Sequence, residues 1–434
     1  MEINNKKVTK ELLLPVINYI HNGNFNDALK LLTQFQKQRF EEDIIFKLKG
    51  SIFLKQRKWQ ESINNYEKYL ETNGNKFEGY YNIGVAYFNL GQLSKTIKNF
   101  EIALTHNKNI QIYESLGIAY KRVGNYKQSS QYFLLGLNLN SKHHRIIQNL
   151  IDNFNYYKPE QSENNILKIN KEILSIGSKL TNQKIITKND ILNLLENSNH
   201  LLNRYNSELT YFETQIFRKN NINLNCKRHL TIFKKNKVIP KFCFGCFKIQ
   251  IKLANVVELI NLLFYFNNLK LKNNNIRKCI VETRSQIKGN YKAYIYCNSI
   301  NESKEILTQV KKDFEKYKIM FNKIEIKHGC TEYYKEYNSF EKIEENNIDK
   351  IYKKDWERIE KKFDEDNFVK EKNKERVFNN TVNQYNLSDF LIIKNWLVYA
   401  KITGDLTYKE VFKSDLKINY LENILKNQIE IRKS

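Results

Sequence analysis

The sequence has little proline and glycine, with three Pro and 14 Gly among 434 residues. This scarcity excludes collagen-like and proline-rich proteins and weighs against an all-β protein with many tight turns. The most apolar stretch, residues 254–266, contains Asn255, Glu258 and Asn261 and is shorter than the ~20 residues that a transmembrane helix needs. The N-terminus also lacks the apolar core of a secretory signal peptide. We expect a mostly helical cytoplasmic protein without a membrane span.

Cysteine is also sparse, and acidic residues are outnumbered by basic ones. Six Cys in a chain of this length do not make a disulfide scaffold, and without an export signal they are expected to be metal ligands or buried thiols. Lys and Arg number 72 against 47 Asp and Glu, which gives a formal net charge of +25. A basic chain favours anionic partners. Because Lys and Asn are frequent along the whole sequence, a compositional bias of the genome explains the charge equally well.

Glycine recurs at a regular spacing in the first third of the chain. Gly50, Gly84 and Gly117 are separated by 34 and 33 residues. Sixteen residues after each Gly stands an aromatic residue, and a small residue lies between the two. The aromatic residues are Tyr66, Phe100 and Phe133, and the small residues are Ser62, Thr96 and Ser129. A period near 34, with small residues where two helices touch, predicts a stacked array of helix–turn–helix units.

This array resembles the tetratricopeptide repeat (TPR) family over about residues 9–142. The best-formed copy carries the family's pattern at Tyr80, Gly84, Tyr87, Thr96, Phe100 and Ala103. The chain departs from the family at Ser62, Thr96 and Ser129, where the family usually has Ala between the two helices. Each unit buries its apolar face only against a neighbour, so the array needs a cap, which we expect from a helix at 145–154.

The resemblance implies a concave groove that binds a peptide or a partner helix and is lined by the first helix of each repeat. In this sequence the lining residues are Lys47, Ser51, Tyr81, Asn82, Val85, Asn89, Glu114, Ile118 and Lys121. One TPR variant grips a C-terminal carboxylate with Lys and Asn, and Lys47 and Asn82 match two of its positions. Ser51 and Val85 stand where that variant has Asn, so we do not infer this ligand. Docking of the array onto the rest of the same chain stays an alternative.

From residue 247 onward the apolar pattern changes from the helical period to an alternation of period two. It predicts strands at 247–253, 279–284, 291–297 and 323–328 and helices at 255–267 and 302–318. This β-α-β-β-α-β order fits a ferredoxin-like sandwich, in which two helices cover one face of a sheet. The expected fold class is thus an α-helical solenoid followed by an α+β domain. The expected domains are 1–155 for the TPR solenoid, 156–220 for a helical connector, 221–340 for the ferredoxin-like domain and 341–434 for a charged helical C-terminal region.

Two ligand-type pairs precede the first of these strands. Cys226 and His229 form one pair, and Cys243 and Cys246 form the other, each with two residues between its members. Two such pairs can hold one Zn²⁺ tetrahedrally, so we expect a structural zinc site. Cys330 is an alternative to His229, and four Cys would also admit an iron–sulfur cluster. Buried thiols without metal are the simpler alternative, and a redox dithiol is disfavoured because a strand rather than a helix follows Cys246.

The sheet face away from the predicted helices is a second candidate site. Alternation places on it the basic and aromatic residues Lys248, Lys252, Arg284, Lys292, Tyr294 and Tyr296. A basic sheet with aromatic residues on its third strand resembles the RNA-recognition fold, in which such residues stack on bases. The first strand lacks the aromatic residue of that family, and a solvated face in a Lys-rich protein is the alternative.

No catalytic motif stands out in the sequence. It contains no Gly-rich phosphate loop, no His-Glu-x-x-His and no Gly-x-Ser-x-Gly. We therefore expect a non-enzymatic adaptor that binds a protein partner through the TPR groove and has a zinc-binding α+β domain. Two alternatives stay open: a nucleic-acid-binding protein, and a transferase-type or iron–sulfur enzyme with a TPR targeting module.

Overall fold

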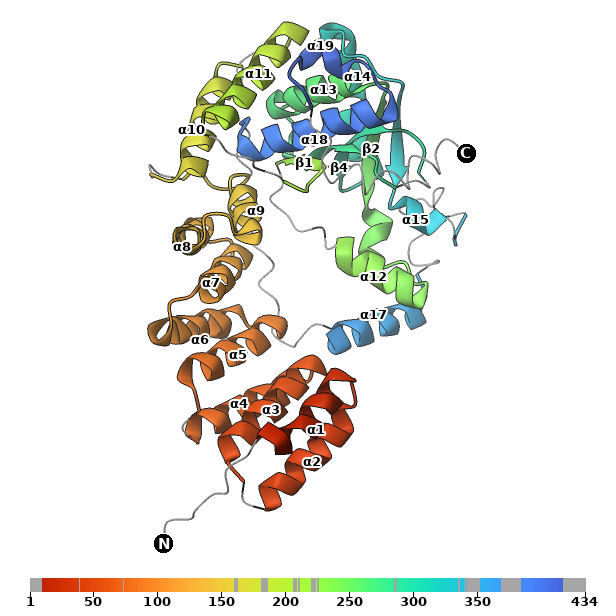
Figure 1. The fold of residues 1–434 in the computed structure, drawn as a ribbon. Coiled ribbons are helices and arrows are strands. Elements are labelled where there is room, and N and C mark those ends of the chain that lie inside the picture. The colour runs from red at the N-terminus through yellow and green to blue at the C-terminus, as the bar shows by residue number, and fades with distance from the viewer. Residues whose placement is uncertain are drawn as a thin grey trace. The chain divides into compact units, whose positions relative to one another are not determined.

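In the computed structural model, the chain folds into two compact units (Figure 1). The first is built on Met1–Ile147 and the second on Gln148–Asp364 and Val377–Ser434. The residues described are 10–38, 40–72, 74–159, 163–180, 186–205, 209, 211–219, 224, 226–284, 287–334, 336–338, 340, 352–367 and 384–416.

The first unit is a succession of helices that pack against their neighbours in chain order (Figure 1). They are α1 (Lys10–His21), α2 (Phe25–Lys37), α3 (Glu42–Lys55), α4 (Trp59–Glu71), α5 (Lys76–Asn89), α6 (Leu93–His106), α7 (Ile110–Arg122) and α8 (Tyr126–Leu139). The boundary between the units falls within α9 (His144–Asn153). In the first turn of α9, Ile146 is fully buried, and Arg145 forms an ion pair with Glu114 of α7.

Local sequence signals explain where these helices begin and end. Asn75, Asn109 and Asn125 precede α5, α7 and α8, and each side chain accepts a hydrogen bond from a backbone N–H of the first turn. Gly91 and Gly124 follow α5 and α7 with φ of 76° and 79°, a conformation that residues with a Cβ rarely adopt. The chain therefore reverses direction at the same point of successive repeats.

The recurrent glycines make room for the recurrent aromatic rings, as the spacing predicts. A Cβ added at Gly50 would lie 2.7 Å from the ring of Tyr66, and one added at Gly117 would lie 2.3 Å from the ring of Phe133. The small residues that depart from the family also have a role. The hydroxyls of Ser62 and Ser129 donate to the carbonyl oxygens of Gly50 and Gly117, at 2.9 and 2.7 Å. The helix-pair array of the sequence prediction is confirmed.

The second unit contains one small antiparallel sheet. Its strands are β1 (Gln215–Arg218), β2 (Phe247–Leu253), β3 (Arg277–Val281), β4 (Tyr291–Cys297) and β5 (Lys323–His328). Their order across the sheet is β1-β3-β4-β2-β5, and every neighbouring pair is antiparallel. The strands and helices between residues 247 and 328 follow one another along the chain in the predicted order, whereas the edge strand β1 was not predicted.

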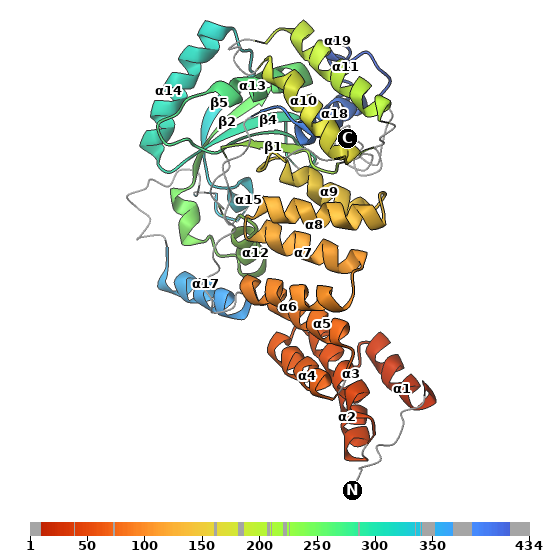
Figure 2. The same ribbon diagram turned by 90° about the vertical axis from the view of Figure 1, so that its left-hand side faces the viewer.

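Helices lie on both sides of this sheet (Figure 2). On one side are α13 (Val256–Asn268) and α14 (Ile300–Tyr317), and on the other are α12 (Cys226–Asn236) and α15 (Thr331–Tyr334). The prediction that helices cover only one face is wrong. Further elements of the second unit are the 3₁₀ turn η1 (Lys241–Gly245) and the helices α10 (Asn165–Ser178), α11 (Lys188–Arg204), α17 (Lys354–Asn367), α18 (Leu387–Thr403) and α19 (Tyr408–Val411).

Helix α18 belongs to the core of the second unit. Its Trp396 is fully buried, and the indole N–H donates to the carbonyl of Thr214 at 2.9 Å. Asp389 in its first turn forms an ion pair with Arg218 of β1 at 2.6 Å, and both side chains are buried. The edge strand is therefore held by a segment that follows it by more than 160 residues.

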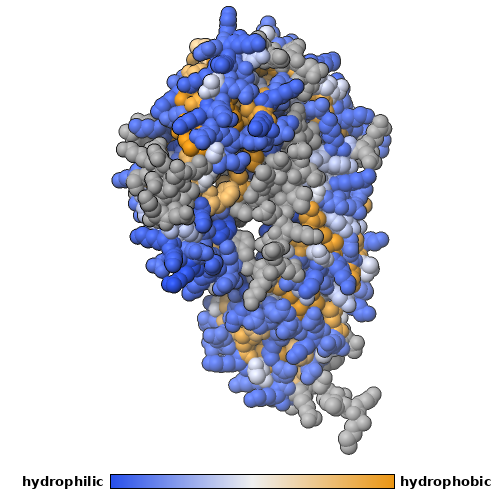
Figure 3. Space-filling model, turned by 180° about the vertical axis from the view of Figure 1, so that it is seen from behind, coloured by the Kyte–Doolittle hydropathy of each residue, from blue (hydrophilic) through white to orange (hydrophobic). Residues whose placement is uncertain are grey.

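The described surface is mainly hydrophilic on the face drawn in Figure 3. On the face drawn in Figure 3, hydrophobic residues form small separate patches among polar and charged ones. Among the described residues, no helix has the length and apolar character needed to span a membrane.

Candidate functional site

The predicted groove residues lie on α3, α5 and α7, the first helices of successive pairs. Each of these side chains is at least partly exposed, whereas Ile83, Ala86 and Leu116 of the same helices are buried. The hydroxyls of Tyr81 on α5 and Ser115 on α7 are hydrogen-bonded at 3.1 Å across 34 positions of sequence. The first helices thus lie side by side and present one continuous surface.

The charges on this surface are paired. Lys47 contacts Glu78 at 2.8 Å, and the hydroxyl of Tyr69 donates to the same carboxylate at 3.2 Å. Burial lowers the pKa of Lys47, but the hydrogen bond and charge of Glu78 outweigh it, so that the pKa is raised. Glu114 likewise contacts Arg145 at 2.9 Å. Glu78 was not predicted from the sequence, because its contact with Lys47 joins two different repeats and no local pattern indicates it.

The centre of the surface is apolar and aromatic. Tyr81 stacks on Phe77 and Phe100, with ring centroids 5.7 and 5.4 Å apart, so its ring is held in place. The partly exposed side chains of Val85 and Ile118 follow on α5 and α7. The arrangement offers a rigid ring and two aliphatic groups to a ligand, and no nucleophile–base pair is placed among the predicted groove residues.

Two asparagines border this apolar centre. The side-chain N–H groups of Asn82 and Asn89 donate to the carbonyls of Glu78 and Val85, at 2.9 Å each. These bonds fix the amide groups on the surface of α5 and leave their side-chain oxygens as acceptors.

Four of the predicted metal ligands belong to segments that meet beside the sheet. Cys243 lies in η1, and Cys246 follows it directly before β2. The backbone N–H of Gly329 donates to the carbonyl of Cys246 at 2.7 Å, which brings Cys330 next to this turn. Cys243 and Cys330 pack in one hydrophobic cluster with Leu230 of α12.

Electrostatic coupling links these four thiols. Burial raises the pKa of Cys243 and raises that of Cys246 to about 12, and charge on Cys330 or Cys226 would raise both further. Partial burial of the Cys226 thiol and charge on Cys330 raise the pKa of Cys226, whereas the ammonium groups of Lys278 and Lys248 lower it. Cys226 is exposed, Cys243 is buried, and Cys246 and Cys330 are partly buried.

His229 does not join this group. Its ring stacks on Phe242 at 5.1 Å, and its pKa is lowered to about 4 by burial and by the neighbouring charge of Arg228. Arg228 in turn binds Glu360 and Asp364 of α17. Within the described ranges, no three His, Cys, Asp or Glu side chains are arranged as a formed metal site. The turn that carries Cys243 and Cys246 thus lies beside Cys330, whereas His229 packs against Phe242.

The sheet face predicted to be exposed is largely covered. Lys292 and Glu282 form an ion pair at 3.0 Å, with 1% of each side chain exposed, and Arg284 binds the same carboxylate at 2.8 Å. Burial raises the pKa of Glu282, but its bonds to Arg284 and Lys292 outweigh burial, and the net shift is downward.

Tyr294 is 8% exposed and accepts a hydrogen bond from Gln250 at 2.7 Å. The expectation that Lys292 and Tyr294 are free to contact nucleic acid is wrong, because neighbouring elements bury them. Tyr296 and Lys248 are partly exposed, and Lys252 pairs with Glu325 at 3.1 Å.

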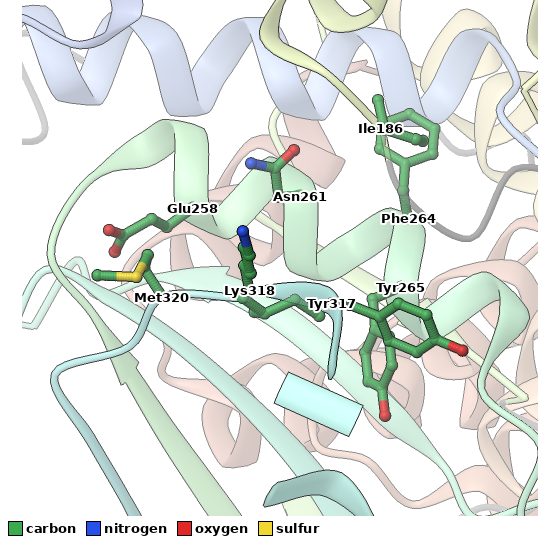
Figure 4. A pocket seen from close by; sticks show the side chains of 9 residues that line it. Ile186, Glu258, Asn261, Phe264, Tyr265, Tyr317, Lys318 and Met320 are labelled. Atoms are coloured by element: carbon green, nitrogen blue, oxygen red, sulfur yellow. The ribbon is translucent and has the colours of Figure 1, made fainter. Parts of the chain in front are cut away.

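A small cavity of about 140 Å³ lies between α13 and the end of α14 (Figure 4). Its lining is Ile186, Glu258, Asn261, Phe264, Tyr265, Tyr317, Lys318, Ile319 and Met320. The side-chain oxygen of Asn261 is buried without a hydrogen-bond partner. The volume suits a few water molecules, at about 30 Å³ each, and a water there would satisfy this oxygen.

Comparisons with known proteins agree with the repeat prediction. The tetratricopeptide repeat family model matches residues 77–108 and 110–143, which span α5 to α8 apart from the first residue of α5, so the predicted resemblance is confirmed there. A comparison with curated proteins finds no match.

Several solved structures are similar to part of the chain. MamA from Desulfovibrio magneticus RS-1 is 16% identical with a TM-score of 0.31, covering 33% of this chain and 82% of its own. YrrB, described as a TPR protein with an unusual peptide-binding site, is 14% identical with a TM-score of 0.29, covering 33% and 78%. The TPR domain of Arabidopsis OM64 is 21% identical with a TM-score of 0.25, covering 26% and 93%. These TM-scores are too low to carry an argument about function.

Proposed function

We propose that the protein is a non-enzymatic interaction adaptor whose TPR array binds a segment of a partner protein across α3, α5 and α7. The observation that carries this proposal is the Tyr81–Ser115 hydrogen bond, because it joins the first helices of two repeats into one surface. The partly exposed Tyr81, Val85 and Ile118 would contact an apolar side chain of the partner.

The polar groups around this apolar centre favour a peptide ligand. The side-chain oxygens of Asn82 and Asn89 are acceptors for backbone N–H groups of an extended or helical segment. Because Lys47 and Glu114 are already paired within the array, the partner's charge would contribute less to affinity than its apolar residues. Aromatic anchors surrounded by polar groups are typical of the positions that dominate binding energy.

We further propose that residues 247–328 form a ferredoxin-like sandwich with β1 added at its edge. The order β3-β4-β2-β5 and the two intervening helices support this assignment. Nucleic-acid binding through the sheet is not favoured, since Lys292 and Tyr294 are buried.

A peptide-display selection on the full chain tests the adaptor function. Selected peptides should bind the parent chain and lose at least tenfold in affinity for a Tyr81→Ala/Asn82→Ala variant. A matched control is Leu135→Ala/Leu139→Ala on α8, where both side chains are exposed on a second helix. If no peptide is enriched, or if the α8 variant loses binding and the α5 variant does not, the proposed groove is incorrect.

A further inference from the structure

We infer that Cys226, Cys243, Cys246 and Cys330 together bind one zinc ion and that His229 is not a ligand. This inference concerns the second unit alone and is independent of the adaptor function. It changes the ligand set expected from sequence spacing, because it replaces the Cys-x-x-His pair with two cysteines from distant segments.

The backbone brings the four positions together. Cys243 and Cys246 lie at the two ends of one tight turn, in which the N–H of Cys246 donates to the carbonyl of Cys243 at 3.3 Å. The bond from Gly329 to the Cys246 carbonyl fixes the end of β5 beside that turn, one residue before Cys330.

Helix α12 brings the fourth cysteine to the same place. Its Leu230 packs in the cluster that contains Cys243 and Cys330. Cys226, the first residue of α12, is four positions earlier and therefore lies on the same face of the helix as Leu230. His229 has a different environment, stacked on Phe242.

Two lysines supply the charge that a tetrathiolate zinc site requires. Four thiolates and one Zn²⁺ carry a net charge of −2, which is costly beside a protein core unless cations lie nearby. The ammonium groups of Lys248 and Lys278 both lie over the ring of Tyr294, each 5.4 Å from its centroid, and Lys248 follows Cys246 by two residues.

Among the described residues, neither Lys248 nor Lys278 forms an ion pair with a carboxylate. Lys278 donates to the amide oxygen of Gln215 at 3.2 Å, and burial and the charge of Lys248 lower its pKa to about 8. Two neighbouring ammonium groups repel each other, and a dianionic metal centre would turn this repulsion into attraction.

The site would be structural. All four ligands come from the protein, so no position is left for a reactive water. The ion would tie the start of α12, the turn before β2 and the end of β5 into one unit. A thiol must lose its proton to bind the metal, so zinc binding would release protons as the four side chains turn toward a common centre.

Cobalt substitution of the full chain tests this inference. The reduced protein is stripped with a chelator and titrated first with Co²⁺ and then with Zn²⁺. We expect one Co²⁺ per chain, visible absorption typical of tetrahedral thiolate coordination, and displacement of Co²⁺ by one equivalent of Zn²⁺. Cys226→Ser, Cys243→Ser, Cys246→Ser and Cys330→Ser should each abolish these bands, whereas His229→Gln and the buried Cys279→Ala should retain them.

The second readout is the metal affinity of the lysine variants. Lys278→Met keeps all four ligands and should weaken Zn²⁺ binding by about 10–100-fold, the usual effect of removing a group that supports the ligands. Circular dichroism of every variant establishes that the chain is folded. Absence of stoichiometric Co²⁺ in the folded parent, loss of the bands in His229→Gln, or purification as a brown iron-containing protein would each overturn the inference.

Discussion

Gly84 and Phe100 are in contact where α5 and α6 pack together: a Cβ added at Gly84 would lie 2.5 Å from Cδ1 of the Phe100 ring. The ring is 2% exposed and therefore has little freedom to move. An alanine in a helix is ordinarily more favourable than glycine by about 1 kcal/mol. Overpacking a core costs about 1–3 kcal/mol, so we expect Gly84→Ala to destabilise α5 by a net of up to ~2 kcal/mol.

Hydrogen exchange of the α5 and α6 amides in the full chain measures this change. Gly79→Ala in the same helix is the matched control, because its new Cβ would meet the partly exposed side chain of Leu70, which can rotate away. If the α5 amides are equally protected from exchange in both variants, close contact with the Phe100 ring does not explain why this position of the repeat is glycine.

The buried pair of Glu282 and Lys292 yields a second prediction. Glu282→Gln removes the carboxylate that Lys292 contacts at 3.0 Å and leaves its ammonium group buried without this counter-charge. Breaking such a pair costs about 3–5 kcal/mol. Denaturant unfolding of the second unit should show that loss, and Glu282→Gln/Lys292→Met should recover part of it. A double variant that is less stable than the single one would contradict the interpretation.

His229 predicts a pH dependence of stability. Its pKa is about 4 in the folded chain, below the value of 6.5 for a free histidine, so the unfolded chain takes up a proton first as the pH falls. The contribution of His229 therefore leaves the free energy of unfolding at its highest above about pH 6.5. That free energy falls as the pH drops toward 4, with a slope of at most ~1.4 kcal/mol per pH unit.

Comparison of two variants isolates this effect. His229→Gln should flatten the decline in the free energy of unfolding between pH 6.5 and 4, whereas replacement of the exposed His106 by Gln should leave it unchanged. Both variants keep all six cysteines, so any contribution from the thiols is common to them. An identical pH profile in the two variants would show that His229 is not buried as described.

The sequence predicted the features that depend on near neighbours or on a repeat. The spacing of Gly84 and Phe100 is meaningful without a structure, because the same pair recurs in the next repeat. Alternating residues likewise predicted β2 and its neighbours, since one face of each strand packs on helices. Strand β1 was missed because Gln215–Arg218 is too short to show a period.

The candidate sites were only partly predictable, because their partners are far apart in the chain. Arg218 meets Asp389, and Cys246 meets the end of β5, through tertiary packing that no local pattern records. His229 was expected to be a ligand because two residues separate it from Cys226, as two residues separate Cys243 from Cys246. The segment is a helix that places His229 against Phe242.

Photo-crosslinking from the groove tests the central claim most directly. A photoreactive amino acid at Val85 on α5, in the full chain, should form a crosslink to a peptide selected by display. The same group at the exposed Leu135 on α8 should form none, and Tyr81→Ala should abolish the Val85 product. A crosslink that forms from Leu135 and not from Val85 would place the partner on another surface and contradict the account.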